Sequence, residues 1–160
     1  MINHILLATD GSEHSRRATD LAADLAATYS VGVTILNVFL SGHVPPELRE
    51  LSDKEVPEHP PMALGGHYVD AELPREVRIE IADKILARAR DRARQLGAPE
   101  VEVSWIDGPA PDRIIEQAHA CGADLIVLGT RGLSQLKGLM LGSVSHKIMQ
   151  LYEGNVLTVR

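Results

Sequence analysis

The chain has 160 residues, of which 44% are hydrophobic and 24% charged, and its formal net charge is −6. A chain of this length buries roughly 70% of the surface that its unfolded form exposes, so one domain can fold without disulfides or structural metals. The negative balance excludes a broad basic surface for nucleic acid or anionic membranes. The single cysteine, Cys121, excludes an internal disulfide, and we expect it to pack as a small apolar residue.

No stretch has the features of a secretion signal or a membrane span. The first residues, MINHILLATDG, lack a basic start, a long apolar run and a small-residue cleavage site. No apolar run approaches the roughly 18 residues that a span requires. We therefore expect a cytoplasmic protein.

The first 39 residues predict a strand, a helix and a second strand. Residues 4–8 form a short apolar run that ends in the turn sequence TDGS. Residues 12–30 have helical spacing, with Asp10 or Ser12 as the cap. Residues 31–39 are rich in β-branched types and predict a buried strand. The helix is expected to bury Ala18, Leu21, Ala22, Leu25, Ala26 and Tyr29.

Residues 41–74 interrupt this alternation. They hold six of the nine prolines and the pair Gly65-Gly66, and they keep no sustained period. We predict an irregular excursion with a short helical turn around 46–52. Its histidines, His43, His59 and His67, match no zinc spacing and are expected to be solvated.

The remaining residues resume the alternation. The pattern predicts helices over 75–96, within 108–122 and over 143–151, and strands over 100–106, 124–129 and 155–159. Gly97 and Gly122 are expected to end their helices, and the charges of 75–94 to form a solvated face. Apolar strands that alternate with helices predict an α/β fold, doubly wound around a parallel sheet with helices on both faces. Ligands of such folds lie at the carboxyl ends of the strands.

The segment 129–145, GTRGLSQLKGLMLGSVS, follows a predicted strand and leads into a predicted helix. Its glycines would let backbone approach a ligand and adopt positive φ, and the N-terminus of the helix would favour phosphate. Ser143 and Ser145 add hydroxyl donors, and Arg131 and Lys137 add cations. Ser143 could equally be a helix cap in an ordinary loop, so the chemistry alone leaves both interpretations open.

The spacing in this segment is neither G-x-G-x-x-G nor the P-loop pattern. It is G-x-x-G-x9-G-S, formed by Gly129, Gly132, Gly142 and Ser143. Together with ILLATDGSEHSRRA, VTILNV and ADLIVLGTRGLSQLKGLMLGSVSHKIM, it resembles the ATP-binding branch of the universal stress protein family. The resemblance covers the chain except about 41–74. It implies one domain over 1–160, a five-stranded parallel sheet of order 3-2-1-4-5, bound ATP and a homodimer.

The resemblance also implies a set of site residues. Asp10 would lie near ribose or a phosphate-bound Mg²⁺, and the backbone at Val38 would meet the adenine edge. The residues expected around adenosine are Ala8, Thr9 and Asp10, and those around ribose and phosphates are Gly129, Arg131, Gly132, Gly142, Ser143, Val144 and Ser145. Two departures are Ala8, where many members carry proline, and YEGNVLTV, where many carry a proline-cysteine-proline segment.

These features predict an ATP-binding, nucleotide-dependent stress-response regulator with at most slow ATP hydrolysis, acting on an unidentified regulatory protein partner. One alternative is an adenylating or ATP-pyrophosphatase-like enzyme, but TDGSEHS lacks the expected S-G-G-x-D-S loop. Another is a nucleotide-free interaction module of the same fold. The last strand, 155–159, is β-prone, uncharged and free of proline, so as an edge strand it would pair two copies into a homodimer.

Overall fold

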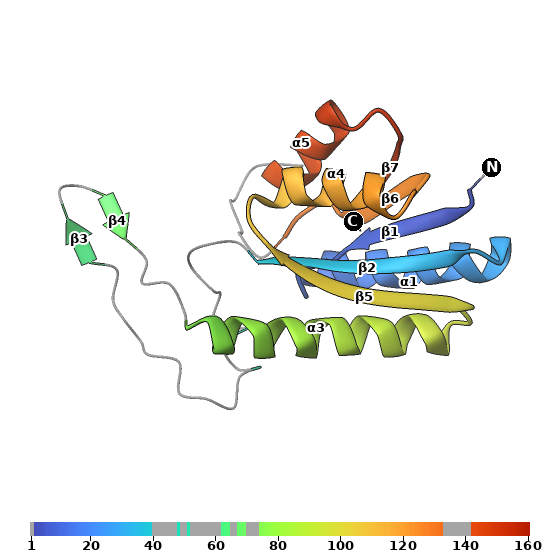
Figure 1. Cartoon of the computed structure of the whole chain (residues 1–160), viewed down its shortest axis with the longest axis horizontal. Helices are drawn as coiled ribbons and strands as arrows, with labels where there is room; N and C mark the ends of the chain where they lie inside the picture. Colours follow the sequence, from blue (N-terminus) through green and yellow to red (C-terminus); the bar gives the residue numbers. More distant parts are fainter. Residues whose placement is uncertain are drawn as a thin grey trace.

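A five-stranded sheet lies between two layers of helices in the computed structural model (Figure 1). The structure describes residues 2–39, 48, 51, 62–64, 67–69, 74–132 and 142–160, with 62–64 and 67–69 as backbone. The elements in chain order are β1 (His4–Ala8), α1 (Glu13–Tyr29), β2 (Gly32–Phe39), β3 (Met62–Leu64), β4 (His67–Val69), α3 (Arg75–Gln95), β5 (Glu100–Asp107), α4 (Ala110–Ala120), β6 (Leu125–Gly129), α5 (Ser143–Leu151) and β7 (Asn155–Val159).

The strands of the large sheet are all parallel and follow the order β5-β2-β1-β6-β7. Counted along this sheet alone, that is the predicted order 3-2-1-4-5. β1 lies in the centre between β2 and β6, where the strand order changes direction. Chains that leave β1 and β6 pass to opposite faces of the sheet, which opens a crevice at the carboxyl ends of these two strands.

Both faces of the sheet are covered, which explains why its strands are continuous apolar runs. Ile5 and Leu7 of β1 pack with buried residues of α1 and α3, while Leu6 packs with those of α4 and α5. The α1 face contributes small side chains, Ser15, Ala18, Thr19, Ala22, Ala23 and Ala26, so this helix packs closely on the sheet. Tyr29 was expected in that face but is 54% exposed, because it is the last residue of the helix.

The helix ends follow local chemistry. Ser12 caps α1 by accepting the backbone N–H of Ser15, so of the two predicted caps it is Ser12 rather than Asp10. Gly97 after α3 and Gly122 after α4 have φ of +91° and +65°. This left-handed conformation is the one in which glycine ends helices, as predicted at both positions.

Part of the predicted irregular segment is regular. β3 and β4 pair antiparallel, with Met62 opposite Val69 and Leu64 opposite His67. The expectation of no regular structure was wrong here, and the signal for the hairpin was the pair Gly65-Gly66 between two short runs. The predicted helical turn around 46–52 lies mostly outside the described residues, as do His43 and His59. Across the described part of the chain, no helix is long and apolar enough to cross a membrane.

Candidate functional site

The candidate site lies where β1 and β6, neighbours in the sheet, both end. The chain continues from β1 into Thr9-Asp10-Gly11 and from β6 into Thr130-Arg131-Gly132. Two hydrogen bonds join these segments across the crevice. Ser12 Oγ donates to the carbonyl oxygen of Arg131 at 3.5 Å, and His14 Nδ1 lies 2.9 Å from Thr130 Oγ1.

The loop after β1 is held by its own polar groups. Asp10 Oδ1 accepts the N–H of Ser12 at 3.0 Å, and Gly11 has a φ of +81° that few other residues adopt. Thr9 is buried and its hydroxyl lies 3.1 Å from Ser15 Oγ. The Thr9 hydroxyl therefore ties the end of β1 to the start of α1, and the expected place of Thr9 beside adenosine stays a prediction.

Gly129 and Gly132 both lie close to residues of the segment that follows β1. A Cβ on Gly129 would lie 2.9 Å from His14 Cβ and 3.0 Å from Ser15 N, so only glycine lets β6 end under the first turn of α1. A Cβ on Gly132 would overlap the carboxylate of Asp10. Neither glycine has positive φ, so the conformational freedom of glycine is not used at these two positions.

The third glycine of the pattern, Gly142, begins α5. Its φ of −71° is also ordinary, and a Cβ there would lie 3.1 Å from the carbonyl oxygen of Thr130. Gly142 is the N-cap residue and no side chain caps the helix. The interpretation of Ser143 as the cap was therefore wrong, since Ser143 is the first helical residue and is exposed.

The start of α5 presents N–H donors that have no partner within the helix. The first N–H groups of a helix, here those of Ser143, Val144 and Ser145, have no partner within it and carry partial positive charge. The Ser145 side chain is buried, and its Oγ lies 3.0 Å from the carbonyl oxygens of both Thr130 and Gly142. Its hydroxyl therefore holds the turn together, which leaves the Ser143 hydroxyl as the exposed one.

Thr130 joins three elements at this site, and the sequence prediction missed it. Its N–H donates to Val159 of β7 at 2.7 Å, and its carbonyl accepts the N–H of Gly142 at 2.6 Å as well as the Ser145 hydroxyl. Its own hydroxyl meets His14. The only signal in the sequence was its position directly after a buried strand.

The peptide groups of Val38 face the crevice side of β2. The carbonyl of Leu36 accepts the N–H of Thr9 at 2.9 Å, so it points toward β1, whereas the carbonyl of Phe39 accepts the N–H of Gly108 and points toward β5. Alternate residues of a strand point their peptide groups the same way, so those of Val38 point as those of Leu36 do. Leu36 is opposite Ala8, the last residue of β1, so the peptide groups of Val38 lie just beyond the end of β1.

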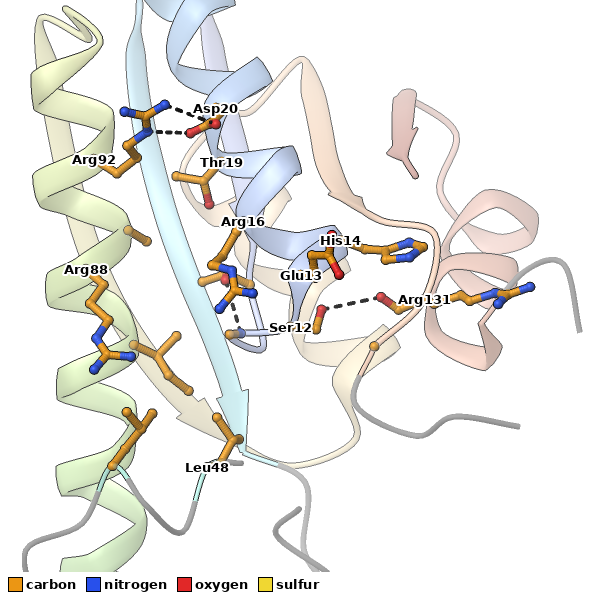
Figure 2. Close-up of a pocket in the computed structure, with 16 residues that line it drawn as sticks. Ser12, Glu13, His14, Arg16, Thr19, Asp20, Leu48, Arg88, Arg92 and Arg131 are labelled. Carbon is orange, nitrogen blue, oxygen red and sulfur yellow. Dashed lines mark hydrogen bonds and ion pairs between the residues drawn. The ribbon is translucent and has the colours of Figure 1, made fainter. Parts of the chain in front are cut away.

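A cavity of about 800 Å³ opens at this edge and continues between α1 and α3 (Figure 2). Of the predicted site residues, Thr9, Arg131 and Gly132 line it, and the Arg131 side chain points away from α3, toward α5 (Figure 2). The cavity also has lining residues that the prediction lacked, among them His14, Arg16 and Arg88. The predicted residues outside its lining are Ala8, Asp10, Val38, Gly129, Gly142, Ser143, Val144 and Ser145.

Only one metal ligand, Asp10, was predicted at this site. Asp10 was the only expected Mg²⁺ contact, and its carboxylate already accepts the Ser12 N–H. Within the described ranges, no group of three or more histidine, cysteine, aspartate or glutamate residues could hold a metal ion. A cation at Asp10 would therefore need most of its oxygen ligands from water or from a phosphate.

Comparisons with known proteins agree with this geometry. The model of the universal stress protein family matches residues 1–160. Universal stress protein YxiE of Bacillus subtilis (strain 168) is 38% identical over 163 residues, which cover 100% of both chains. A universal stress protein solved in complex with cAMP has a TM-score of 0.68 and 27% identity, covering 99% of this chain and 97% of that chain.

A further solved structure is similar in fold. The universal stress protein from Archaeoglobus fulgidus in complex with dAMP has a TM-score of 0.66 and 22% identity, covering 100% of this chain and 98% of that chain. The sheet order, the glycine-serine loop after β6 and the match over residues 1–160 lead to one conclusion. This chain belongs to the universal stress protein family.

Proposed function

We propose that this protein binds ATP at the edge where β1 and β6 end, and that it acts in the cytoplasm as a nucleotide-dependent stress-response regulator on a protein partner. The observation that carries the proposal is the N-terminus of α5, which no side chain caps and where Gly142 keeps the backbone uncovered. Such a helix start favours phosphate. The family member solved with cAMP supports an adenine nucleotide as the ligand.

The residues present fit the parts of ATP. The N–H groups of Ser143 and Val144, with the exposed Ser143 hydroxyl, would bind phosphate oxygens, and Arg131 would add a cation. The peptide groups of Val38 would take the adenine edge. Only the N–H donor and the C=O acceptor of the Val38 peptide groups would contact the base. We expect their arrangement to match the edge of adenine better than that of guanine.

Mg²⁺ would accompany the phosphates at the Asp10 carboxylate and neutralise their charge. Asp10→Ala is then expected to weaken the Mg²⁺-dependent part of ATP binding in calorimetry, while Mg²⁺-free binding changes little. Positioning a water for attack needs a further side chain, and the sequence pattern offers no evident one, so we expect slow hydrolysis at most. Equal loss with and without Mg²⁺ would argue against this role for Asp10.

A pair of isosteric variants at Ser143 tests the phosphate site. Ser143→Asp places a carboxylate at the start of α5, where it interacts favourably with the helix by roughly 0.3–1 kcal/mol but repels phosphate. Ser143→Asn has the same shape without the charge. We expect Ser143→Asp to bind ATP at least tenfold more weakly, about 1.4 kcal/mol, than Ser143→Asn, and to be no less stable in thermal unfolding.

Three outcomes would count against the proposal. Equal ATP affinity of Ser143→Asp and Ser143→Asn would show that the phosphates do not bind at the start of α5. Release of pyrophosphate from ATP would favour an adenylating or ATP-pyrophosphatase-like enzyme. Absence of any nucleotide from the purified protein, together with no binding in calorimetry, would favour an interaction module.

We also propose a homodimer through β7, an edge strand of the sheet. The Val159 carbonyl bonds to Thr130, so Val159 and Leu157 direct their peptide groups toward β6, while Val156 and Thr158 direct theirs outward. Antiparallel pairing of two such edges around a two-fold axis gives a closed interface. On α5, the helix just before β7, Met149 and Leu151 are 42% and 59% exposed, which would add apolar area to such an interface.

A further inference from the structure

The cavity at the candidate site extends well beyond the loops. It continues along facing sides of α1 and α3, and we name this part the α1–α3 groove. From Ser12 at the loop end to Asp20 at the far end are eight helical steps, roughly 12 Å at 1.5 Å per residue. The residues that line the groove are Arg16, Thr19 and Asp20 of α1 and Ile85, Arg88, Ala89 and Arg92 of α3.

The lining of the whole cavity is locally positive in a negative protein. Its described residues include four arginines (Arg16, Arg88, Arg92 and Arg131) and two acidic residues (Glu13 and Asp20), whereas the chain carries −6. Such a local excess of positive charge favours anions despite the global balance.

The arginines of the groove have different surroundings. Arg92 donates to both carboxylate oxygens of Asp20, at 2.6 and 3.2 Å, and this pair closes the far end. Arg16 and Arg88 have no ion-pair partner in the part of the chain that the structure describes. Both line the cavity, and Figure 2 shows Arg16 on the side of α1 that faces α3 and Arg88 along α3.

We propose that Arg16 and Arg88 form a second anion subsite, for a phosphate group that lies beyond the ATP site. A guanidinium binds phosphate through two parallel N–H bonds, so two guanidinium groups in one cavity, neither ion-paired to a described residue, suit a phosphate group. The cavity of about 800 Å³ falls within the size range of small-molecule sites. Ile85 and Ala89 give the groove apolar surface for the organic part of a ligand.

The ligand class that matches this shape is an elongated phosphate ester, with one end at the loops and another anionic group at Arg16, four helical steps or roughly 6 Å from Ser12. A dinucleoside polyphosphate is such a molecule. The same subsite would also take a separate small phosphate beside ATP. This proposal depends on the proposed function only for the part of the ligand at the loops. The arginines of the groove would bind phosphate whatever the loops bind.

Calorimetry with paired variants tests the subsite. Arg16→Gln/Arg88→Gln removes both cations of the subsite, and Arg17→Gln/Arg94→Gln removes two cations from the same helices outside the cavity lining. The probes are ATP, diadenosine tetraphosphate, and pyrophosphate with and without saturating ATP. All four arginines are exposed, so both variants should keep the wild-type unfolding temperature.

We expect the groove variant to bind diadenosine tetraphosphate at least tenfold more weakly than wild type while its ATP affinity changes little. The control variant should bind both as wild type does. Pyrophosphate that binds wild type beside ATP, but not the groove variant, would identify a separate phosphate as the ligand. A response to diadenosine tetraphosphate alone would identify the elongated one.

Other results would overturn the subsite. These are unchanged affinity of the groove variant for both diadenosine tetraphosphate and pyrophosphate, equal losses in the control variant, or an ATP loss as large as that for diadenosine tetraphosphate. If wild type binds no ATP, the proposed function fails. The anion subsite is then tested by pyrophosphate binding alone. Binding that depends on Arg16 and Arg88 would then support the subsite, and its absence would overturn it.

Discussion

Gly129→Ala should lower the stability of the fold, whereas Gly132→Ala should leave stability nearly unchanged and alter ATP binding. Both glycines nevertheless belong to one loop pattern. A methyl group at Gly129 would lie 2.9 Å from His14 Cβ and 3.0 Å from both His14 C and Ser15 N. Two of these three atoms are backbone at the start of α1, and β6 is fixed in the sheet by its pairing with β7. The helix must therefore shift. Among the described residues, the methyl group at Gly132 would meet only the Asp10 carboxylate, the end of a side chain that can rotate.

Overpacking that moves backbone typically costs about 1–3 kcal/mol. For a domain of this size each 1 kcal/mol lowers the unfolding temperature by about 2–4 °C. Gly129→Ala, at about 2 kcal/mol, should therefore unfold about 4–8 °C below wild type. Gly132→Ala should stay within about 2 °C, because only a side chain moves, yet it should alter Mg²⁺-dependent ATP binding because Asp10 must turn.

Thermal unfolding followed by circular dichroism, with urea unfolding as a second measure, compares the two variants with wild type. ATP calorimetry on the same samples separates loss of stability from loss of binding. The reasoning is refuted if Gly129→Ala unfolds at the wild-type temperature, or if Gly132→Ala is the less stable of the two.

The remaining predictions concern the dimer edge, the N-terminal strand and the base. Thr158→Pro removes an outward N–H from β7 and should convert dimer to monomer in sedimentation equilibrium; a wild-type chain that is already monomeric would contradict the dimer. The N–H groups of Asn3 and His4 lower the pKa of Asp124, so its carboxylate adds stability above the ordinary pKa of about 3.9, which is lost as pH falls through the lowered value. Urea unfolding of wild type and Asp124→Asn should therefore differ at neutral pH and converge once the pH falls below the lowered pKa, whereas a constant difference would argue against this role. In competition for the site, GTP should bind more weakly than ATP because only peptide groups near Val38 meet the base, and equal binding would show that these groups do not select it.

Local patterning predicted the elements well wherever one period persisted. The helix 143–151 and the strand 155–159 have the predicted bounds, because the apolar period changes sharply at their ends. β3 and β4 were missed because each has only three residues, too few to establish a period. Tyr29 was wrongly predicted to be buried, because periodicity does not show at which residue a helix stops contacting the sheet.

The site was predicted less completely, for a reason that lies in tertiary structure. The spacing of Gly129 and Gly132 located the loop, but what each glycine accommodates, the first turn of α1 and the Asp10 carboxylate, depends on distant segments. Arg16 and Arg88 look like solvated charges on their own helices. They line one groove only because α1 and α3 pack side by side, as the bond between Asp20 and Arg92 across 72 positions illustrates.

Thr130 makes the first turn of α5 and the end of the sheet open as one unit. Helix ends ordinarily fray, and their amides exchange with solvent at little free-energy cost. Here the N–H of Gly142 is bonded to the Thr130 carbonyl, and the N–H of Thr130 is bonded to Val159. Releasing the helix turn thus loosens the residue that anchors the last strand. Amide hydrogen exchange at Gly142 and Thr130 should report a single opening free energy, well above that of a frayed end, and a nucleotide that orders the turn should slow exchange at both positions equally.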